Sequence, residues 1–140
     1  MSGTPKVGGG LQPVWKAPAQ PATFYQIPLA SDLTVRIGLV ARTEVEDPSF
    51  YNVVHKHWKR EVGLVVSASG AGYVYPKGAN HTSCPVHYLG DFESSIERLA
   101  TMIVEQPQGS LTLVHCNNAF HRAPLLFVAV LKKWGWFSTV

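Results

Sequence analysis

The chain has 140 residues, of which 46% are hydrophobic and 15% charged, and this composition excludes a disordered protein and predicts one globular domain. The net charge of +3 suits an anionic substrate. It is too small for a nucleic-acid partner, because basic residues form only one short cluster, at residues 56–60. Two cysteines do not make a disulfide framework, and neither a signal peptide nor a membrane-spanning run of about 18 apolar residues is recognisable. We therefore expect a protein of the reducing cytoplasm, or of the nucleus, with no membrane partner and an oligomeric state that the composition leaves open.

The first 23 residues have the composition of a flexible N-terminal arm. Residues 1–23 combine three consecutive glycines with four prolines and show no hydrophobic periodicity. Trp15 is expected to dock on the domain formed by residues 24–140, and a partner-binding tail is the alternative.

Hydrophobic periodicity predicts the elements of residues 24–140. In chain order we expect strands at residues 24–28 and 33–40, a helix at 48–60 that starts at Asp47 and Pro48, a strand at 62–67, a strand at 85–89, a helix that follows Asp91 and ends near Glu105, a strand at 111–114 and a helix from Pro124 to Leu131. Residues 67–83 are predicted to be a surface loop that holds at most a short strand at 72–75. The alternation of strands and helices predicts an α/β fold, a single domain with a mainly parallel central sheet flanked by helices.

Cys116 and Arg122 bracket a five-residue loop between a buried strand and an apolar helix. The backbone N–H groups of such a loop converge on one concavity, and the helix N-terminus adds about half a positive charge, so the loop favours an anion. A cysteine at its base would be held as the thiolate, and an arginine at its rim can bind two phosphate oxygens with its planar fork. A purely structural cysteine is the alternative, but it would leave Arg122 an unpaired charge near the core. The predicted phosphate ligands are Asn117, Asn118, Ala119, Phe120, His121 and Arg122.

His115, Cys116 and Arg122 match the HCX5R signature of the cysteine-dependent protein phosphatases, and from Leu33 to Leu131 the chain resembles their dual-specificity branch. Residues 36–39 resemble the first core strand of that branch, and residues 62–67 resemble the strand after its first helix. The resemblance implies a protein tyrosine phosphatase-like fold and hydrolysis of phosphorylated protein through a phosphocysteine on Cys116, without metal or cofactor. It also implies that Arg122 holds the phosphate and that His115 orients the loop and favours the thiolate.

Asp91 has two interpretations that both remain open. It stands where a helix N-cap is expected. It also follows the strand after which the family places its general acid, which protonates the leaving oxygen. His87 is the fallback acid. Loops at residues 67–83 wall the cleft in the family, so Tyr73, Tyr75, Lys77 and His81 are candidates for contact with substrate, with a plain surface loop as the alternative.

The loop departs from the family pattern at two positions. Ala119 replaces the usual glycine, at a cost of about 1–2 kcal/mol if the backbone there is left-handed. Ala123 replaces a serine or threonine whose hydroxyl helps the thiolate leave the intermediate, which predicts slow turnover. These departures keep open a pseudophosphatase that binds phosphorylated partners, and a third hypothesis is a phosphatase of RNA 5′ ends or phosphoinositides. The chain ends soon after Gly135, where relatives add helices, which is typical of a truncated chain or a minimal member.

Cys84 is the second cysteine. We expect it to be a partly buried bystander. If it lies near Cys116, a reversible disulfide could protect the nucleophile.

Overall fold

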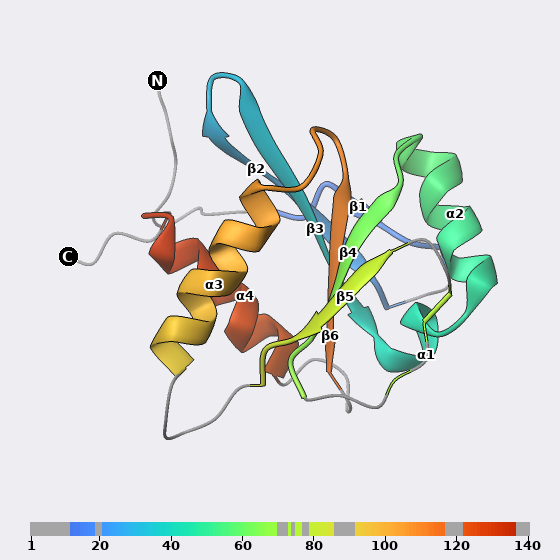
Figure 1. Ribbon diagram of the computed structural model, residues 1–140. Coiled ribbons are helices and arrows are strands. Elements are labelled where there is room, and N and C mark those ends of the chain that lie inside the picture. The colour runs from blue at the N-terminus through green and yellow to red at the C-terminus, as the bar shows by residue number, and fades with distance from the viewer. Residues whose placement is uncertain are drawn as a thin grey trace.

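Six strands form one sheet in the computed structural model, which describes residues 12–18, 21–69, 73, 75–76, 79–85, 92–116 and 122–136. The sheet order is β1-β2-β3-β6-β4-β5 (Figure 1), with β1 at Trp15–Lys16, β2 at Thr23–Ala30, β3 at Leu33–Ala41, β4 at Val62–Ser67, β5 at Asn80–Ser83 and β6 at Leu111–Cys116. The pairs β1–β2 and β2–β3 are antiparallel, whereas β3–β6, β6–β4 and β4–β5 are parallel. The predicted α/β domain with a mainly parallel sheet is therefore confirmed.

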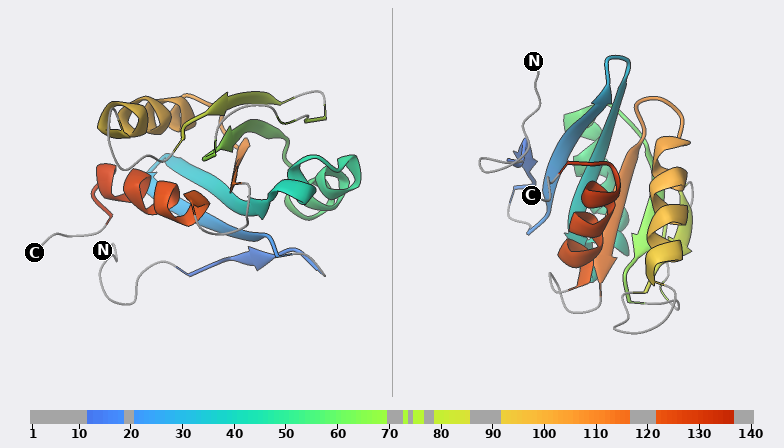
Figure 2. Two further views of the ribbon diagram at one scale, coloured as in Figure 1. Left: turned by 90° about the horizontal axis from the view of Figure 1, so that it is seen from below. Right: turned by 90° about the vertical axis from the view of Figure 1, so that its left-hand side faces the viewer.

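Helices cover both faces of the sheet. They are α1 at Arg42–Val45, α2 at Pro48–Trp58, α3 at Phe92–Val104 and α4 at Arg122–Lys133. The helices α3 and α4 pack side by side on one face, and α1 and α2 lie on the other (Figure 2). The core is accordingly divided into two hydrophobic clusters, one between the sheet and α3 and α4, the other between the sheet and α2. Among the described residues, no helix is both long and apolar enough to cross a membrane.

Helix α2 begins at the predicted residue, Pro48, and ends two residues before the predicted end at residue 60. The Asp47 side chain accepts a hydrogen bond from the Ser49 backbone N–H at 3.0 Å, and Pro48 occupies the first turn, where a missing N–H costs nothing. The helix ends at Trp58 because Lys59 adopts a left-handed conformation with φ of 56°. Phe50 and Val54 are buried, as the predicted apolar stripe requires.

Trp15 docks on the domain, as predicted. Strand β1 pairs Trp15 with Phe24 of β2, and the Trp15 ring stacks on His57 of α2 at a centroid distance of 4.1 Å. Its ring also contacts Trp58 edge-on at 6.4 Å. Residues of the predicted arm thus extend the sheet by one short strand and cover the end of α2.

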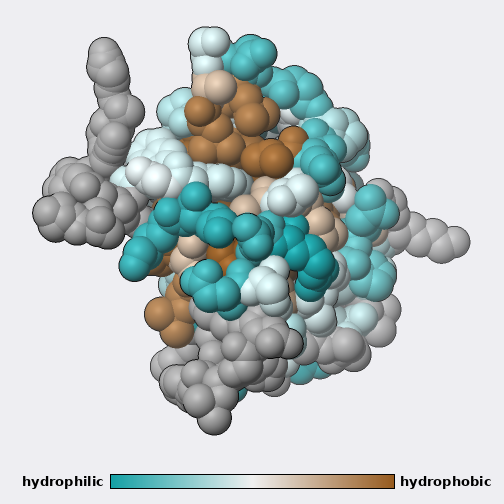
Figure 3. Space-filling view, turned by 60° about the vertical axis from the view of Figure 1, so that its left-hand side comes forward, coloured by the Kyte–Doolittle hydropathy of each residue, from teal (hydrophilic) through white to brown (hydrophobic). Residues whose placement is uncertain are grey.

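Helix α4 begins at Arg122, two residues before the predicted start at Pro124. It buries one stripe against the sheet and α3, while Leu125 and Val128 remain 60% and 42% exposed. Figure 3 views the side of the molecule from which α3 and α4 face outward, where hydrophilic side chains occupy the middle of the surface and a hydrophobic patch lies above them. The helix is followed by Gly135, which has a positive φ of 81°.

The predicted strand at residues 85–89 falls, except for Pro85, outside the described part of the chain. Strand β5, Asn80–Ser83, was not predicted. It pairs in parallel with β4 on the side away from β6, and Pro85 lies after its end. Strand β5 forms one edge of the sheet, and its side chains are exposed or half-buried. A polar edge strand has no hydrophobic alternation to reveal it, so residues 67–83 were predicted to be a loop. Tyr73 and Tyr75, in the region of the predicted short strand, are not in a strand.

Candidate active site

Cys116 is the last residue of β6, the strand between β3 and β4. All six residues of β6 are buried, as expected for an apolar strand inside a parallel sheet. In register, Cys116 lies beside Ala41 of β3, and His115 lies beside Ser67 of β4. The Cys116 side chain is 1% exposed and belongs to the core cluster on the α3 and α4 face. The predicted nucleophile is therefore at the carboxyl edge of the parallel strands, where ligands bind in open α/β sheets.

Arg122 is the first residue of α4 and is exposed. Its Nη1 donates a hydrogen bond of 3.4 Å to the hydroxyl of Ser69, which lies just beyond the end of β4. The Ala68 N–H donates to the His115 carbonyl at 2.8 Å, so the ends of β4 and β6 stay paired at this point. The arginine and the cysteine thus come from the two ends of one loop to the same edge of the sheet. Ala123, which follows the arginine, is fully buried.

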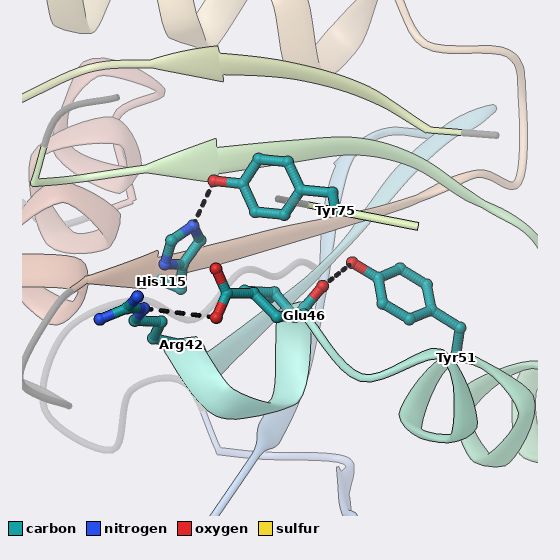
Figure 4. Close-up of polar contacts among 6 residues, drawn as sticks. Arg42, Glu46, Tyr51, Tyr75 and His115 are labelled. Atoms are coloured by element: carbon teal, nitrogen blue, oxygen red, sulfur yellow. Dashed lines mark hydrogen bonds and ion pairs between the residues drawn. The ribbon is translucent and has the colours of Figure 1, made fainter. Parts of the chain in front are cut away.

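His115 is buried on the opposite face of the sheet from Cys116. Its Nε2 lies 2.6 Å from the Tyr75 hydroxyl, and the Tyr73 ring meets it edge-on at a centroid distance of 4.8 Å (Figure 4). Burial lowers the pKa of His115 to about 4, and the nearby Glu46 carboxylate offsets this only in part. Burial also raises the pKa of Tyr75 to about 12. At neutral pH the pair is therefore a neutral imidazole and a neutral phenol that share a short hydrogen bond.

Arg42 and Glu46 form an ion pair beside this histidine. Both belong to the turn of helix that directly follows β3, and Arg42 Nε lies 3.3 Å from Glu46 Oε1. The Arg42 guanidinium also lies over the Tyr73 ring, 5.3 Å from its centroid. In Figure 4 the Arg42 guanidinium and the Glu46 carboxylate both lie beside the His115 ring. These two charged groups act on the pKa of His115 in opposite directions: Glu46 raises it, and Arg42 lowers it by a smaller amount.

Two hydrogen bonds hold this short helix in place. The Ala41 N–H donates to Glu44 Oε1 at 2.8 Å, and the Tyr51 hydroxyl donates to the Val45 carbonyl at 2.7 Å (Figure 4). Glu44 is buried, and burial raises its pKa above the usual range of a glutamate. Because α1 is tied to both β3 and α2, Arg42 and Glu46 stand on a fixed support.

Several predicted site residues lie outside the described part of the chain. They are the loop residues Asn117, Asn118, Ala119, Phe120 and His121, the two candidate acids Asp91 and His87, and Lys77. His81 is described, and its ring packs against that of Tyr75 at a centroid distance of 5.2 Å. In the described residues, no three histidine, cysteine, aspartate or glutamate side chains gather into a metal site.

Cys84 is fully buried rather than partly buried, and it follows the end of β5. Strand β4 lies between β5 and β6, and Ser67 is paired with both Ser83 and His115. The Cα atoms of Cys84 and Cys116 are thus about 9–10 Å apart, which is twice the spacing of neighbouring strands. A disulfide requires Cα atoms closer than about 7 Å, so the two cysteines cannot be bridged unless the backbone moves.

Arg42, Glu46 and the bond between Tyr75 and His115 were not predicted from the sequence. The signal for the first two was present, since residues just after the predicted strand at 33–40 must lie beside the end of the Cys116 strand if the two strands are parallel neighbours. Nothing in the sequence pairs Tyr75 with His115, because the contact spans 40 residues.

No protein-family model matches the chain, and no curated protein matches it in sequence.

Proposed function

We propose that this protein is a cysteine-dependent phosphatase with a protein tyrosine phosphatase-like fold, and that it hydrolyses phosphate monoesters of phosphorylated proteins. The observation that supports it most is the position of Cys116 and Arg122. The cysteine ends the central parallel strand, and the arginine opens the following helix and bonds to Ser69 at the end of the neighbouring strand. A five-residue loop closed in this way can direct its N–H groups at one phosphate.

In this proposal His115 acts through its position rather than its charge. A neutral imidazole adds no positive charge that would stabilise a thiolate, so that task falls to the loop N–H groups and Arg122. Tyr75 and Tyr73 hold the ring of His115, and the backbone of His115 ties the base of the loop to β4. Tyr75 is thus a positioning residue for the loop.

The chemistry takes two steps. The Cys116 thiolate attacks phosphorus, so that an S–P bond forms as the P–O bond to the leaving group breaks, and the leaving oxygen takes a proton from an acid, which the family resemblance assigns to Asp91. Arg122 and the loop N–H groups bind the three equatorial oxygens and stabilise the charge that develops there. Water then attacks phosphorus and gives a proton to the carboxylate that the acid became in the first step, the S–P bond breaks, and phosphate and the thiolate are released.

A second candidate is a pseudophosphatase that binds phosphorylated partners without turnover. Ala123 favours it, because this buried residue has no hydroxyl to assist departure of the thiolate from phosphocysteine. Binding needs only the loop and Arg122, whereas turnover needs both steps.

The experiment that separates these functions is hydrolysis of a small aryl phosphate, measured together with vanadate binding. The proposal predicts that Cys116→Ser abolishes turnover, whereas the matched control Cys84→Ser retains it in protein that remains folded. Arg122→Lys keeps the charge but loses the planar fork, and it should weaken vanadate binding while Arg98→Lys on α3 does not. Vanadate binding without turnover in the wild type would favour the pseudophosphatase, and the absence of both would contradict the proposal.

A further inference from the structure

We infer that Arg42, held against the ring of Tyr73, is a second anion-binding position beside the Cys116 loop, and that it selects phosphate monoesters with a second phosphate group close to the first. This inference rests on the proposed function, because the first phosphate is the one held by the loop. It assigns a class of substrate that the cysteine and its loop do not specify.

The place of Arg42 in the sheet is the first argument. Arg42 directly follows Ala41, and Ala41 is the register partner of Cys116 on the neighbouring parallel strand. Neighbouring strands are about 4.8 Å apart, so the backbone of Arg42 lies next to the point where the Cys116 loop begins. The sheet therefore brings two arginines to its carboxyl edge, Arg42 from the end of β3 and Arg122 from the start of α4.

The orientation of Arg42 is the second argument. Arg42 Nε lies 3.3 Å from Glu46 Oε1, and the guanidinium carbon lies over the Tyr73 ring, 5.3 Å from its centroid. The ion pair with Glu46 is made through Nε, and among the hydrogen bonds of the described residues none has a terminal nitrogen of Arg42 as its donor (Figure 4). The side chain is 49% exposed. An arginine that only anchored α1 would direct its terminal N–H groups at backbone carbonyls. Here the ion pair and the Tyr73 ring fix the guanidinium, and its side chain is exposed to solvent.

The chemistry of a guanidinium is the third argument. Its paired terminal N–H groups match two oxygens of a phosphate, and a side chain that is already held in place loses little entropy when it binds. Glu46 lies on the Nε side and His115 is neutral, so neither places a negative charge in front of the fork. Glu44 is buried and bonded to Ala41. A second phosphate that reaches the fork therefore meets hydrogen-bond donors and no described carboxylate.

The test compares anions in the Cys116→Ser background, which prevents turnover. Calorimetry would measure the binding of inorganic phosphate, pyrophosphate and inositol 4,5-bisphosphate. The two phosphates of pyrophosphate share an oxygen, whereas those of inositol 4,5-bisphosphate are esters on neighbouring carbons. We expect at least one of the two diphosphates to bind about tenfold more tightly than phosphate, the size of one charge-assisted hydrogen-bonded contact. The diphosphate that binds more tightly than phosphate shows which arrangement of two phosphate groups the site accepts.

Arg42→Gln should remove this gain and leave the affinity for inorganic phosphate within about twofold. Lys56→Gln, on the exposed side of α2, makes the same change in net charge far from the site and should preserve the gain. Arg42→Lys keeps the charge without the fork and should lose most of the gain, which provides a second test if Arg42→Gln is unstable.

Two results would overturn the inference and leave the proposed function standing. In the first, phosphate binds but neither diphosphate binds more tightly than phosphate. In the second, a diphosphate still binds more tightly than phosphate in Arg42→Gln. If none of the three anions binds, the proposed function fails together with the inference.

Discussion

Acidification should destabilise the protein through His115. Its pKa is about 4 in the folded protein and 6.5 when the ring is free in water, so the unfolded chain takes up the proton first as the pH falls. The stabilising contribution is complete above pH 6.5 and is lost as the pH decreases from 6.5 to about 4. At about 1.4 kcal/mol for each pKa unit, this loss amounts to about 3 kcal/mol of unfolding free energy.

The assay is urea unfolding at about pH 7.5 and at about pH 4, with wild type compared with His115→Gln. Carboxylates titrate in the same range in both proteins, so the difference between their pH dependences isolates His115. The wild type should lose about 3 kcal/mol more than the variant. Tyr75→Phe should cost about 1–3 kcal/mol at neutral pH, because it leaves a buried ring nitrogen without its partner. Equal losses in wild type and His115→Gln, or a proton NMR titration that gives His115 an ordinary pKa, would refute the reasoning.

Three further predictions concern the acid, the loop and the N-terminal strand. If Asp91 is the general acid, Asp91→Asn should slow hydrolysis of alkyl phosphates far more than that of an activated aryl phosphate, and equal slowing would leave it only a helix cap. Ala123→Ser should raise the steady-state rate and reduce any burst, and an unchanged rate would show that breakdown of phosphocysteine is not limited by the missing hydroxyl. Trp15→Ala should lower the unfolding free energy by about 2 kcal/mol because it removes the stack on His57, whereas Val14→Ala, at an exposed position, should change it by less than about 0.5 kcal/mol in the same urea titration.

The sequence predicts those helices and strands whose buried side chains produce a recognisable hydrophobic pattern. The alternation at the start of β3 is visible in its burial, although residues 37–40 are buried on both faces, and the continuous apolar run of β6 reflects burial on both faces. Strand β5 was not predicted, because a strand at the edge of the sheet pairs with one neighbour and buries few of its side chains. The predicted start of helix α4 is two residues late. A proline such as Pro124 indicates the first turn of a helix but does not show at which position of that turn it stands.

The sequence predicts those parts of the candidate site that lie within one continuous segment. It does not predict the contacts between segments that the sheet brings together. The spacing of Cys116 and Arg122 follows from one strand-loop-helix unit. The contacts of His115 with Tyr75, and of Arg42 with Tyr73, join segments that meet only once β3, β6 and the chain after β4 are side by side. These contacts depend on strand order, which hydrophobic periodicity does not encode.

Detection of a phosphocysteine is the measurement that tests the proposed function most directly. Protein quenched in acid during turnover of an aryl phosphate would be digested and its cysteine peptides analysed by mass spectrometry, with Cys84 as the internal comparison. The proposal predicts a phosphoryl group on Cys116 and none on Cys84, and more of it accumulated in the wild type than in Ala123→Ser. Turnover that continues in Cys116→Ser, or a wild type that binds vanadate but never becomes labelled on Cys116, would contradict it.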